Sequence, residues 1–203
     1  MPAILDVDGL CFGYPRRPLF DHWSARIGPG ITLVLGGDGS GKTSLLRLIA
    51  GELVAASGRL RIHDTSLADD PRAYRSKLCW IDPRTSDHDQ ISGRQFLQSR
   101  PDIQMEGPAW DGLVRGLSLE PFLDKPLFML STGSKRKVWL AAAFASSTPL
   151  TLLDQPFAAL DRPSIGYVRA RLAAAAMDTT RVWVVADYET LADVPLCATF
   201  DLD

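Results

Sequence analysis

Short apolar runs, separated by turn residues, form the main pattern of this sequence. Residues 31–35 are β-branched or aliphatic and are bounded by glycines on both sides, which predicts a buried strand. The same pattern predicts further strands at 77–81, 150–153 and 182–186, and a last strand within 196–203. Helical patterns are found at 43–50, 135–146 and 164–177. Strands that alternate with helices favour a mainly parallel sheet covered by helices on both faces.

Two stretches depart from this alternation. Residues 4–27 show alternation and turn residues without a helical pattern, which predicts an antiparallel β ribbon. Beyond residue 83, proline, glycine and aspartate punctuate short helical pieces, which predicts a small inserted helical lobe. We therefore predict one α/β domain, divided as follows: mainly antiparallel β at 1–30, the core at 31–83 and 134–203, and the helical lobe at 84–133.

Composition and charge narrow the possible functions. The chain has 203 residues with a formal net charge of −2, so it lacks the basic excess of a nucleic-acid-binding surface. Its three cysteines are widely spaced and odd in number, which favours a reduced, cytoplasmic setting. We expect no signal peptide, and the longest apolar stretch, 138–153, is interrupted and too short to span a membrane. A role at a membrane would therefore require a partner.

A glycine-rich segment between the first core strand and the first helix carries the strongest chemical signal. Its sequence, GGDGSGKT, fits a phosphate-binding loop, in which backbone N–H groups surround phosphates at a helix N-terminus. Lys42 is expected to reach the terminal phosphates, and the Thr43 hydroxyl to bind Mg²⁺. The flanking strand and helix disfavour a chance glycine-rich turn, so we predict a P-loop NTPase core. The candidate nucleotide-binding residues here are Gly36, Gly37, Asp38, Gly39, Ser40, Gly41, Lys42, Thr43 and Ser44.

A second set of motifs follows in a fixed order. The segment LSTGSK at 130–135 precedes a helix, then LLDQP at 152–156 and ALD at 159–161. With Tyr14 and the phosphate loop ahead of them, these motifs resemble the ATP-binding cassette (ABC) family over essentially the full length of the chain. The variant LSTGSKRK is more similar to small exporter cassettes than to sugar importers. The resemblance implies a homodimer or pseudo-dimer around two ATP molecules, in which Ser131 and Gly133 of one subunit face the γ-phosphate of the other.

The resemblance also implies roles for single residues. Tyr14 matches the aromatic residue that stacks on adenine, and base stacking contributes roughly 1–3 kcal/mol. Asp154 matches the acid oriented to Mg²⁺ or to its waters. Asp82 stands where the family has a glutamine, and could supply an oxygen to Mg²⁺ in its place.

Three positions depart from the family's hydrolytic pattern. Gln155 replaces the catalytic glutamate, Asp187 replaces a histidine, and Asp82 replaces the loop glutamine. An amide can orient a water but cannot take its proton, so we predict firm ATP binding and slow or absent hydrolysis. An ionised Asp187 near the γ-phosphate would cost about 4 kcal/mol per charge pair, so it must be protonated, bridged by a cation or turned away. The candidate catalytic residues are Gln155, Asp187 and Asp82.

The first turn of the helix after LSTGS contains three cations, Lys135, Arg136 and Lys137. Cations at a helix N-terminus oppose its dipole by a few tenths of a kcal/mol each, roughly. Either an anion docks on this helix end or the side chains point into water, and the sequence leaves both open.

The function we predict is the ATP-binding subunit of an ABC transporter. It binds Mg-ATP, dimerises around it and drives a separate transmembrane subunit from the cytoplasmic face of the membrane, with no nucleic-acid partner. The alternative is a nucleotide-gated binding module with little or no turnover. A repair or translation cassette is disfavoured because the chain has neither a coiled-coil insertion nor a second cassette. A small-molecule kinase is disfavoured because it would not need the LSTGS segment.

Overall fold

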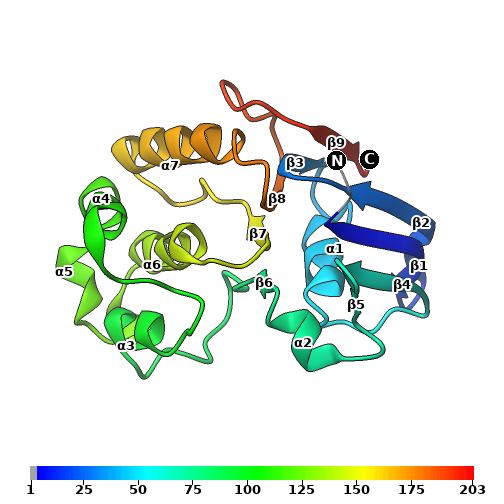
Figure 1. Cartoon of the computed structure of the whole chain (residues 1–203), viewed down its shortest axis with the longest axis horizontal. Coiled ribbons are helices and arrows are strands. Elements are labelled where there is room, and N and C mark those ends of the chain that lie inside the picture. Colours follow the sequence, from blue (N-terminus) through cyan, green and yellow to red (C-terminus); the bar gives the residue numbers. More distant parts are fainter. Residues whose placement is uncertain (1–3) are drawn as a thin grey trace. The chain divides into compact units, whose positions relative to one another are not determined.

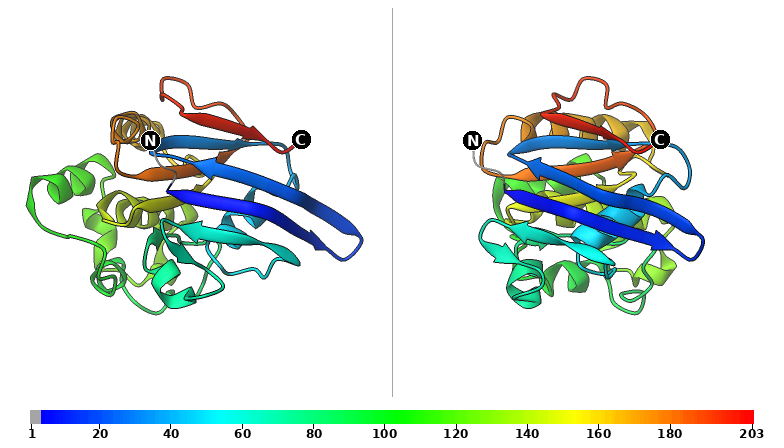
Figure 2. Two further views of the ribbon diagram at one scale, coloured as in Figure 1. Left: turned by 45° about the vertical axis from the view of Figure 1, so that its right-hand side comes forward. Right: turned by 90° about the vertical axis from the view of Figure 1, so that its right-hand side faces the viewer.

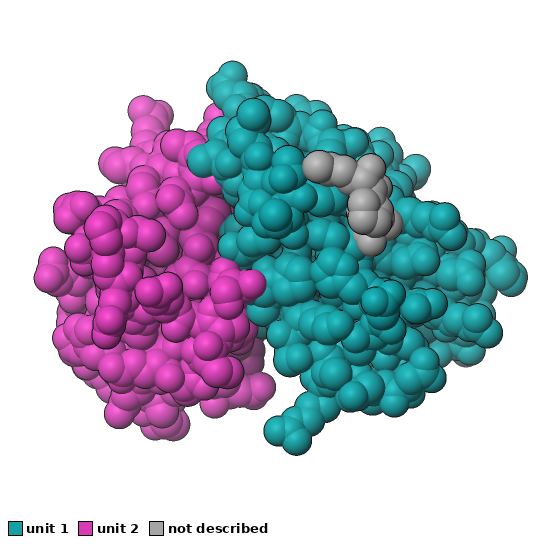
Figure 3. All heavy atoms as spheres, viewed as in Figure 1, with its two compact units in different colours: residues 1–80, 148–155, 173–203 teal, residues 81–147, 156–172 magenta. Residues whose placement is uncertain are grey.

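The computed structural model describes residues 4–203 and divides the chain into two compact units (Figure 3). Unit 1 contains residues 1–80, 148–155 and 173–203, and unit 2 contains residues 81–147 and 156–172. Residues 1–3 of the predicted mainly antiparallel region 1–30 lie outside the described residues. Unit 2 is wider than the predicted lobe at 84–133, because it also includes the helix that follows LSTGS and most of the next one.

An antiparallel sheet begins unit 1. Strands β1 (Leu5–Tyr14) and β2 (Arg17–Ile27) form a hairpin, as the alternation predicted. The other edge of β1 pairs with β4 (Ser57–Ile62), and β4 pairs in turn with the short strand β5 (Thr65–Ser66). The order of strands in this sheet is therefore β2-β1-β4-β5 (Figure 2). Sequence analysis did not predict β4, although Leu60 and Ile62 are buried and alternate with exposed arginines.

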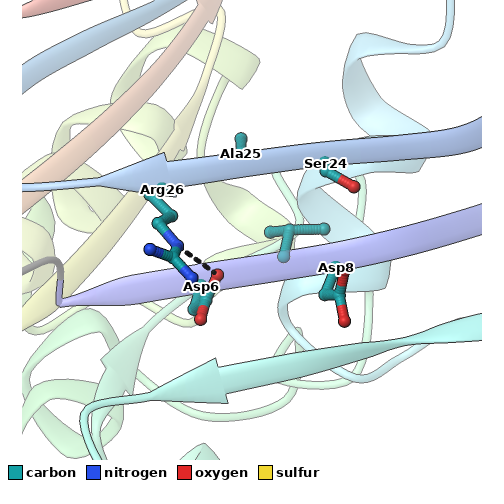
Figure 4. Close-up of a pocket in the computed structure, with 6 residues that line it drawn as sticks. Asp6, Asp8, Ser24, Ala25 and Arg26 are labelled. Atoms are coloured by element: carbon teal, nitrogen blue, oxygen red, sulfur yellow. Dashed lines mark ion pairs between the residues drawn. The ribbon is translucent and has the colours of Figure 1, made fainter.

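The outer face of this sheet is a ladder of opposite charges. Figure 4 shows Asp6 and Asp8 along β1 beside Arg26 and Ser24 of β2. The Arg26 Nε lies 3.7 Å from Asp6 Oδ1, and on the other side the register sets Asp6 opposite Arg61 of β4. Opposite charges on neighbouring strands contribute roughly 0.2–1 kcal/mol per pair. This face is therefore solvated, and the apolar side chains of the sheet turn to the core.

A parallel sheet forms the second layer of unit 1. Its order is β6-β7-β8-β3-β9, and every neighbouring pair is parallel. The strands are β6 (Leu78–Cys79), β7 (Leu150–Asp154), β8 (Val182–Asp187), β3 (Gly30–Leu35) and β9 (Ala198–Asp201). All five were predicted, but β6 is shorter than 77–81. The carboxyl ends of parallel strands meet at one edge of a sheet, which is where such folds bind ligands.

Helices complete unit 1. Helix α1 (Lys42–Ile49) packs against β7 and β8 (Figure 1), and its apolar side chains share one core with both sheets. The short helix α2 (Pro71–Arg75) begins at Asp70, whose carboxylate accepts the Ala73 N–H at 2.9 Å. The mainly parallel core and the antiparallel ribbon thus agree with the predicted α/β class.

The regular elements described in unit 2 are helices joined by loops. Its helices are α3 (Gly93–Gln98), α4 (Gly107–Gly116), α5 (Glu120–Leu123), the 3-10 turn η1 (Leu127–Met129), α6 (Thr132–Ala145) and α7 (Arg162–Ala175), whose last three residues belong to unit 1. Phe96 of α3 and Trp139 of α6 pack edge to face with ring centroids 4.6 Å apart. Among the described residues, no helix is long and apolar enough to cross a membrane.

Candidate functional site

The glycine-rich loop joins the end of β3 to the start of α1. Gly41, the N-cap of α1, has a φ of 108°, and a Cβ there would lie 3.2 Å from the Phe20 ring. Gly36 has a φ of 153°, and a Cβ there would overlap the Ser40 hydroxyl. Both positions therefore require glycine, which lets the backbone curl at the helix N-terminus.

Lys42 is the one cation of the loop 36–43, and only 4% of its surface is exposed. Its ammonium donates hydrogen bonds to the carbonyl oxygens of Gly36 (2.5 Å) and Gly37 (2.7 Å), and lies 4.2 Å from the ring centroid of Tyr188. Among the described residues, no carboxylate lies within ion-pair distance of this ammonium. A buried charge is costly unless it is paired, so the site fits an anion such as phosphate.

Thr43 and Asp154 meet across the loop. The Thr43 hydroxyl donates to Asp154 Oδ2 at 2.7 Å, and Asp154 is 6% exposed at the end of β7. Hydroxyl and carboxylate oxygens are the hard ligands that Mg²⁺ accepts, so this pair fits the predicted metal position.

Gln155 and Asp187 lie at the ends of neighbouring strands. Gln155 has left-handed backbone geometry (φ 48°), and its N–H donates to the Ala186 oxygen at 2.8 Å. Asp187 is opposite Leu35 in the register, and its Oδ1 accepts the backbone N–H of Tyr188 at 2.7 Å. Burial raises the pKa of Asp187, so its carboxyl group holds a proton more readily than usual.

Tyr188 is a site residue that sequence analysis missed. Its hydroxyl donates to Asp38 Oδ1 at 2.5 Å and accepts from Gln155 Nε2 at 3.1 Å. The hydrogen bond to Asp38 raises the pKa of Tyr188, so the phenol stays protonated. The available signal was its position directly after Asp187, at the carboxyl end of a predicted strand.

The β1–β2 hairpin also reaches the loop. The Tyr14 hydroxyl lies 3.2 Å from the Ser44 hydroxyl of α1, and 45% of Tyr14 is exposed. Arg17, which was not predicted, donates from Nη2 to the Gly39 oxygen at 2.7 Å. Tyr14 is thus beside the phosphate loop, where the predicted stacking on adenine requires it; that stacking stays a prediction.

The LSTGS segment and Asp82 belong to unit 2. Ser131 is the N-cap of α6, and its hydroxyl accepts the Ser134 N–H at 3.1 Å. A Cβ at Gly133 would overlap the Ala159 carbonyl oxygen. Asp82 Oδ1 accepts the Arg84 N–H at 2.9 Å. The roles of Ser131, Gly133 and Asp82 towards a nucleotide or metal stay predictions.

Two of the three cations at the start of α6, Lys135 and Lys137, have carboxylate partners inside unit 2. Lys135 Nζ lies 2.5 Å from Asp89 Oδ1, and Lys137 Nζ lies 2.6 Å from Asp161 Oδ2. The hydrogen bond from Lys137 holds the pKa of Asp161 well below its usual range. Neither a docked anion nor exposure to water is therefore needed to explain these two lysines, because acids of the same unit balance their charges.

The fold and this site define a P-loop nucleotide-binding domain: a glycine loop between a parallel strand and a helix, a buried lysine, and an acid at the end of another strand of the same sheet. The chain belongs to the ABC transporter family, whose model matches residues 20–158, and it is the ATP-binding subunit of such a transporter.

Curated relatives and solved structures agree with this assignment. The chain is 34% identical over 180 residues to the "Cytochrome c biogenesis ATP-binding export protein CcmA" of Pseudomonas putida strain KT2440, covering 86% of this chain and 84% of the relative. The protein of the same name from Rhodospirillum rubrum is 35% identical over 174 residues, covering 85% and 75%. A putative ABC transporter ATP-binding protein from Pyrococcus furiosus has the same fold, with a TM-score of 0.74 at 21% identity over 98% of this chain and 96% of that one.

Proposed function

We propose that the chain binds ATP together with Mg²⁺ at the loop 36–43, and that Lys42 is the main cationic contact of the phosphates. The observation that carries this proposal is the buried Lys42 ammonium, which is held by two backbone carbonyl oxygens and faces no described carboxylate within ion-pair distance. Phosphate oxygens in place of these carbonyls would give the ammonium a full counter-charge.

Other groups of unit 1 are proposed to contact the phosphates, the metal and the adenine. The backbone N–H groups of the loop face the phosphates at the N-terminus of α1. Thr43 and Asp154, already 2.7 Å apart, provide oxygens for Mg²⁺. The exposed ring of Tyr14 provides a surface for the adenine.

We propose further that two copies associate around Mg-ATP, with Ser131 and Gly133 of one copy facing the γ-phosphate held by the other. The partner that moves substrate is a separate transmembrane subunit, and the chain acts on it from the cytoplasmic face. Because the relatives are named export proteins of cytochrome c biogenesis, an export-type transporter is the partner we propose.

Hydrolysis by this chain is proposed to be slow. Gln155 stands in place of the family's catalytic glutamate, and an amide has no useful basicity. Loss of a general base costs about 10²–10⁴-fold in rate. Meanwhile the neutral amide removes a negative charge beside the phosphates, which favours the ATP-bound state.

Calorimetry of the purified chain with Mg-ATP tests the binding site. The parent should bind, and Lys42→Ala should show no detectable binding, because the phosphates lose their cationic partner. Lys125→Ala removes an exposed lysine of unit 2 and is the matched control. Equal affinity of the Lys42→Ala variant and the parent would contradict the proposed site.

A further inference from the structure

We propose that Tyr188 is a positioning residue that fixes the orientation of the Gln155 side-chain amide, and that this arrangement requires an amide rather than a carboxylate at position 155. The hydrogen bonds exist within unit 1 itself. Their role in holding a water at the γ-phosphate rests on the proposed function.

The polarity of the network follows from counting hydrogens. A carboxylate has none, and a phenol has one, which the short Tyr188–Asp38 contact of 2.5 Å directs to Asp38 Oδ1. The phenol oxygen is then an acceptor, and Gln155 Nε2 donates to it at 3.1 Å. The amide nitrogen is thereby assigned to the Tyr188 side, and Oε1 turns to the opposite side of the amide.

The network connects three elements that form the site. Asp38 belongs to the phosphate loop, Gln155 follows β7, and Tyr188 follows β8. The Tyr188 ring also covers the Lys42 ammonium at 4.2 Å, so the hydroxyl is held beside the proposed phosphate position. With its nitrogen committed to Tyr188, the Gln155 amide has the two lone pairs of Oε1 with which to orient a water, without removing a proton.

A glutamate at position 155 would oppose this arrangement. Two carboxylates would then flank one phenol oxygen, and the single hydroxyl hydrogen could serve only one of them. The two negative charges would also repel each other. An asparagine at position 38 would relieve the conflict, because its amide can donate to the phenol oxygen while the phenol hydrogen turns to the carboxylate at 155. Both hydrogen bonds of the phenol would then have the opposite direction from those in the parent.

A double-mutant cycle tests the inference. The variants are Gln155→Glu, Asp38→Asn and their combination, and the readout is the equilibrium constant of urea unfolding without nucleotide. Gln155→Glu alone should shift this constant towards the unfolded state by about tenfold, and in the Asp38→Asn background by less than about threefold. Equal shifts in the two backgrounds would overturn the proposal.

A spectroscopic readout separates positioning from general stability. In the isotope-labelled parent, the NMR signals of the Gln155 side-chain amide should move when Tyr188→Phe removes the hydroxyl and leaves the ring. Tyr14→Phe removes the other tyrosine hydroxyl beside the loop, which contacts Ser44, and should leave these signals in place. Amide signals that do not respond to Tyr188→Phe would overturn the proposal.

Both readouts are made without nucleotide, so their outcome is independent of whether the chain binds ATP. Calorimetry with Mg-ATP on the same variants then tests the site itself. Failure of the parent to bind ATP would contradict the proposed function while the cycle still decides the network.

Discussion

Each unit buries one lysine, and the two lysines have different surroundings. Lys42 of unit 1 is 4% exposed and donates only to backbone carbonyl oxygens among the described residues. Lys137 of unit 2 is 7% exposed and forms an ion pair with Asp161 at 2.6 Å. A buried charge is stable when an opposite charge or several hydrogen bonds compensate it. Lys137 has its opposite charge within the fold, whereas no described carboxylate lies within ion-pair distance of Lys42.

This difference distinguishes the lysine proposed to bind phosphate from a lysine balanced within the fold, and the order of the motifs alone does not make that distinction. Lys135 and Lys137 stand in the LSTGSKRK segment, next to residues proposed to face a phosphate. Their acids, Asp89 and Asp161, already balance them. The proposed contribution of this segment to a neighbouring nucleotide therefore comes from the Ser131 hydroxyl and backbone N–H groups rather than from net charge.

The largest expected effect is on the rate of ATP hydrolysis, when the amide of Gln155 and the carboxyl group of Asp187 are replaced. Gln155→Glu combined with Asp187→His should raise the rate of ATP hydrolysis by about 10²–10⁴-fold, because it restores a general base and removes a carboxyl group beside the phosphates. Gln155→Glu alone should gain less, since Tyr188 and Asp38 oppose a carboxylate there. A steady-state phosphate-release assay measures both. Fast hydrolysis by the parent would mean that another group, Asp187 or Asp82, acts as the base.

The next effect tests whether the uncharged groups at the start of α6 contribute to ATP-dependent association of two copies. The parent should be largely monomeric without nucleotide and should double its mass with Mg-ATP in light scattering. Gly133→Ala should weaken this association by about 10–100-fold, because the new Cβ overlaps the Ala159 oxygen and displaces the start of α6. Gly166→Ala is the matched control, since a Cβ there meets nothing within 4 Å. An unchanged mass on adding Mg-ATP would contradict the proposed dimer.

A smaller effect tests whether Lys137 is structural. Asp161→Ala leaves a buried ammonium without its acid and should lower the free energy of unfolding by about 1–3 kcal/mol. Lys137→Met should cost less, because the apolar stem is kept and the remaining Asp161 carboxylate is half-exposed. Urea unfolding of both variants measures this. A greater loss for Lys137→Met would show that the lysine itself, rather than its charge balance, stabilises unit 2.

The smallest effect is a pH dependence. Burial raises the pKa of Asp187, so the folded chain binds a proton more tightly there than the unfolded chain. The linked stability is present below the ordinary aspartate pKa of about 3.9 and is lost as the pH rises through the raised value. The free energy of unfolding of the parent should therefore fall as the pH rises through this value. Asp187→Asn cannot titrate there and should lack this fall. Parallel pH profiles for parent and variant would contradict the assignment.

The positions of the strands and of the phosphate loop could be predicted because they depend on local patterns. The run at 31–35 became β3, and the acid at 154 fell at the end of β7, as parallel-strand order requires. Strand β4 was missed because its alternation, carried by Leu60 and Ile62, spans only a few residues. The contact between Tyr188 and Asp38 joins residues 150 positions apart, and no local pattern encodes it.

The close packing of α6 against the loop at 156–161 has a mechanical consequence within unit 2. The Ala159 carbonyl rests where a Gly133 side chain would be, and the Lys137–Asp161 ion pair holds the same loop one helical turn further along. A steric contact at one point and an ion pair at another therefore join the loop to the start of the helix. We expect a displacement of either segment to move the other as well.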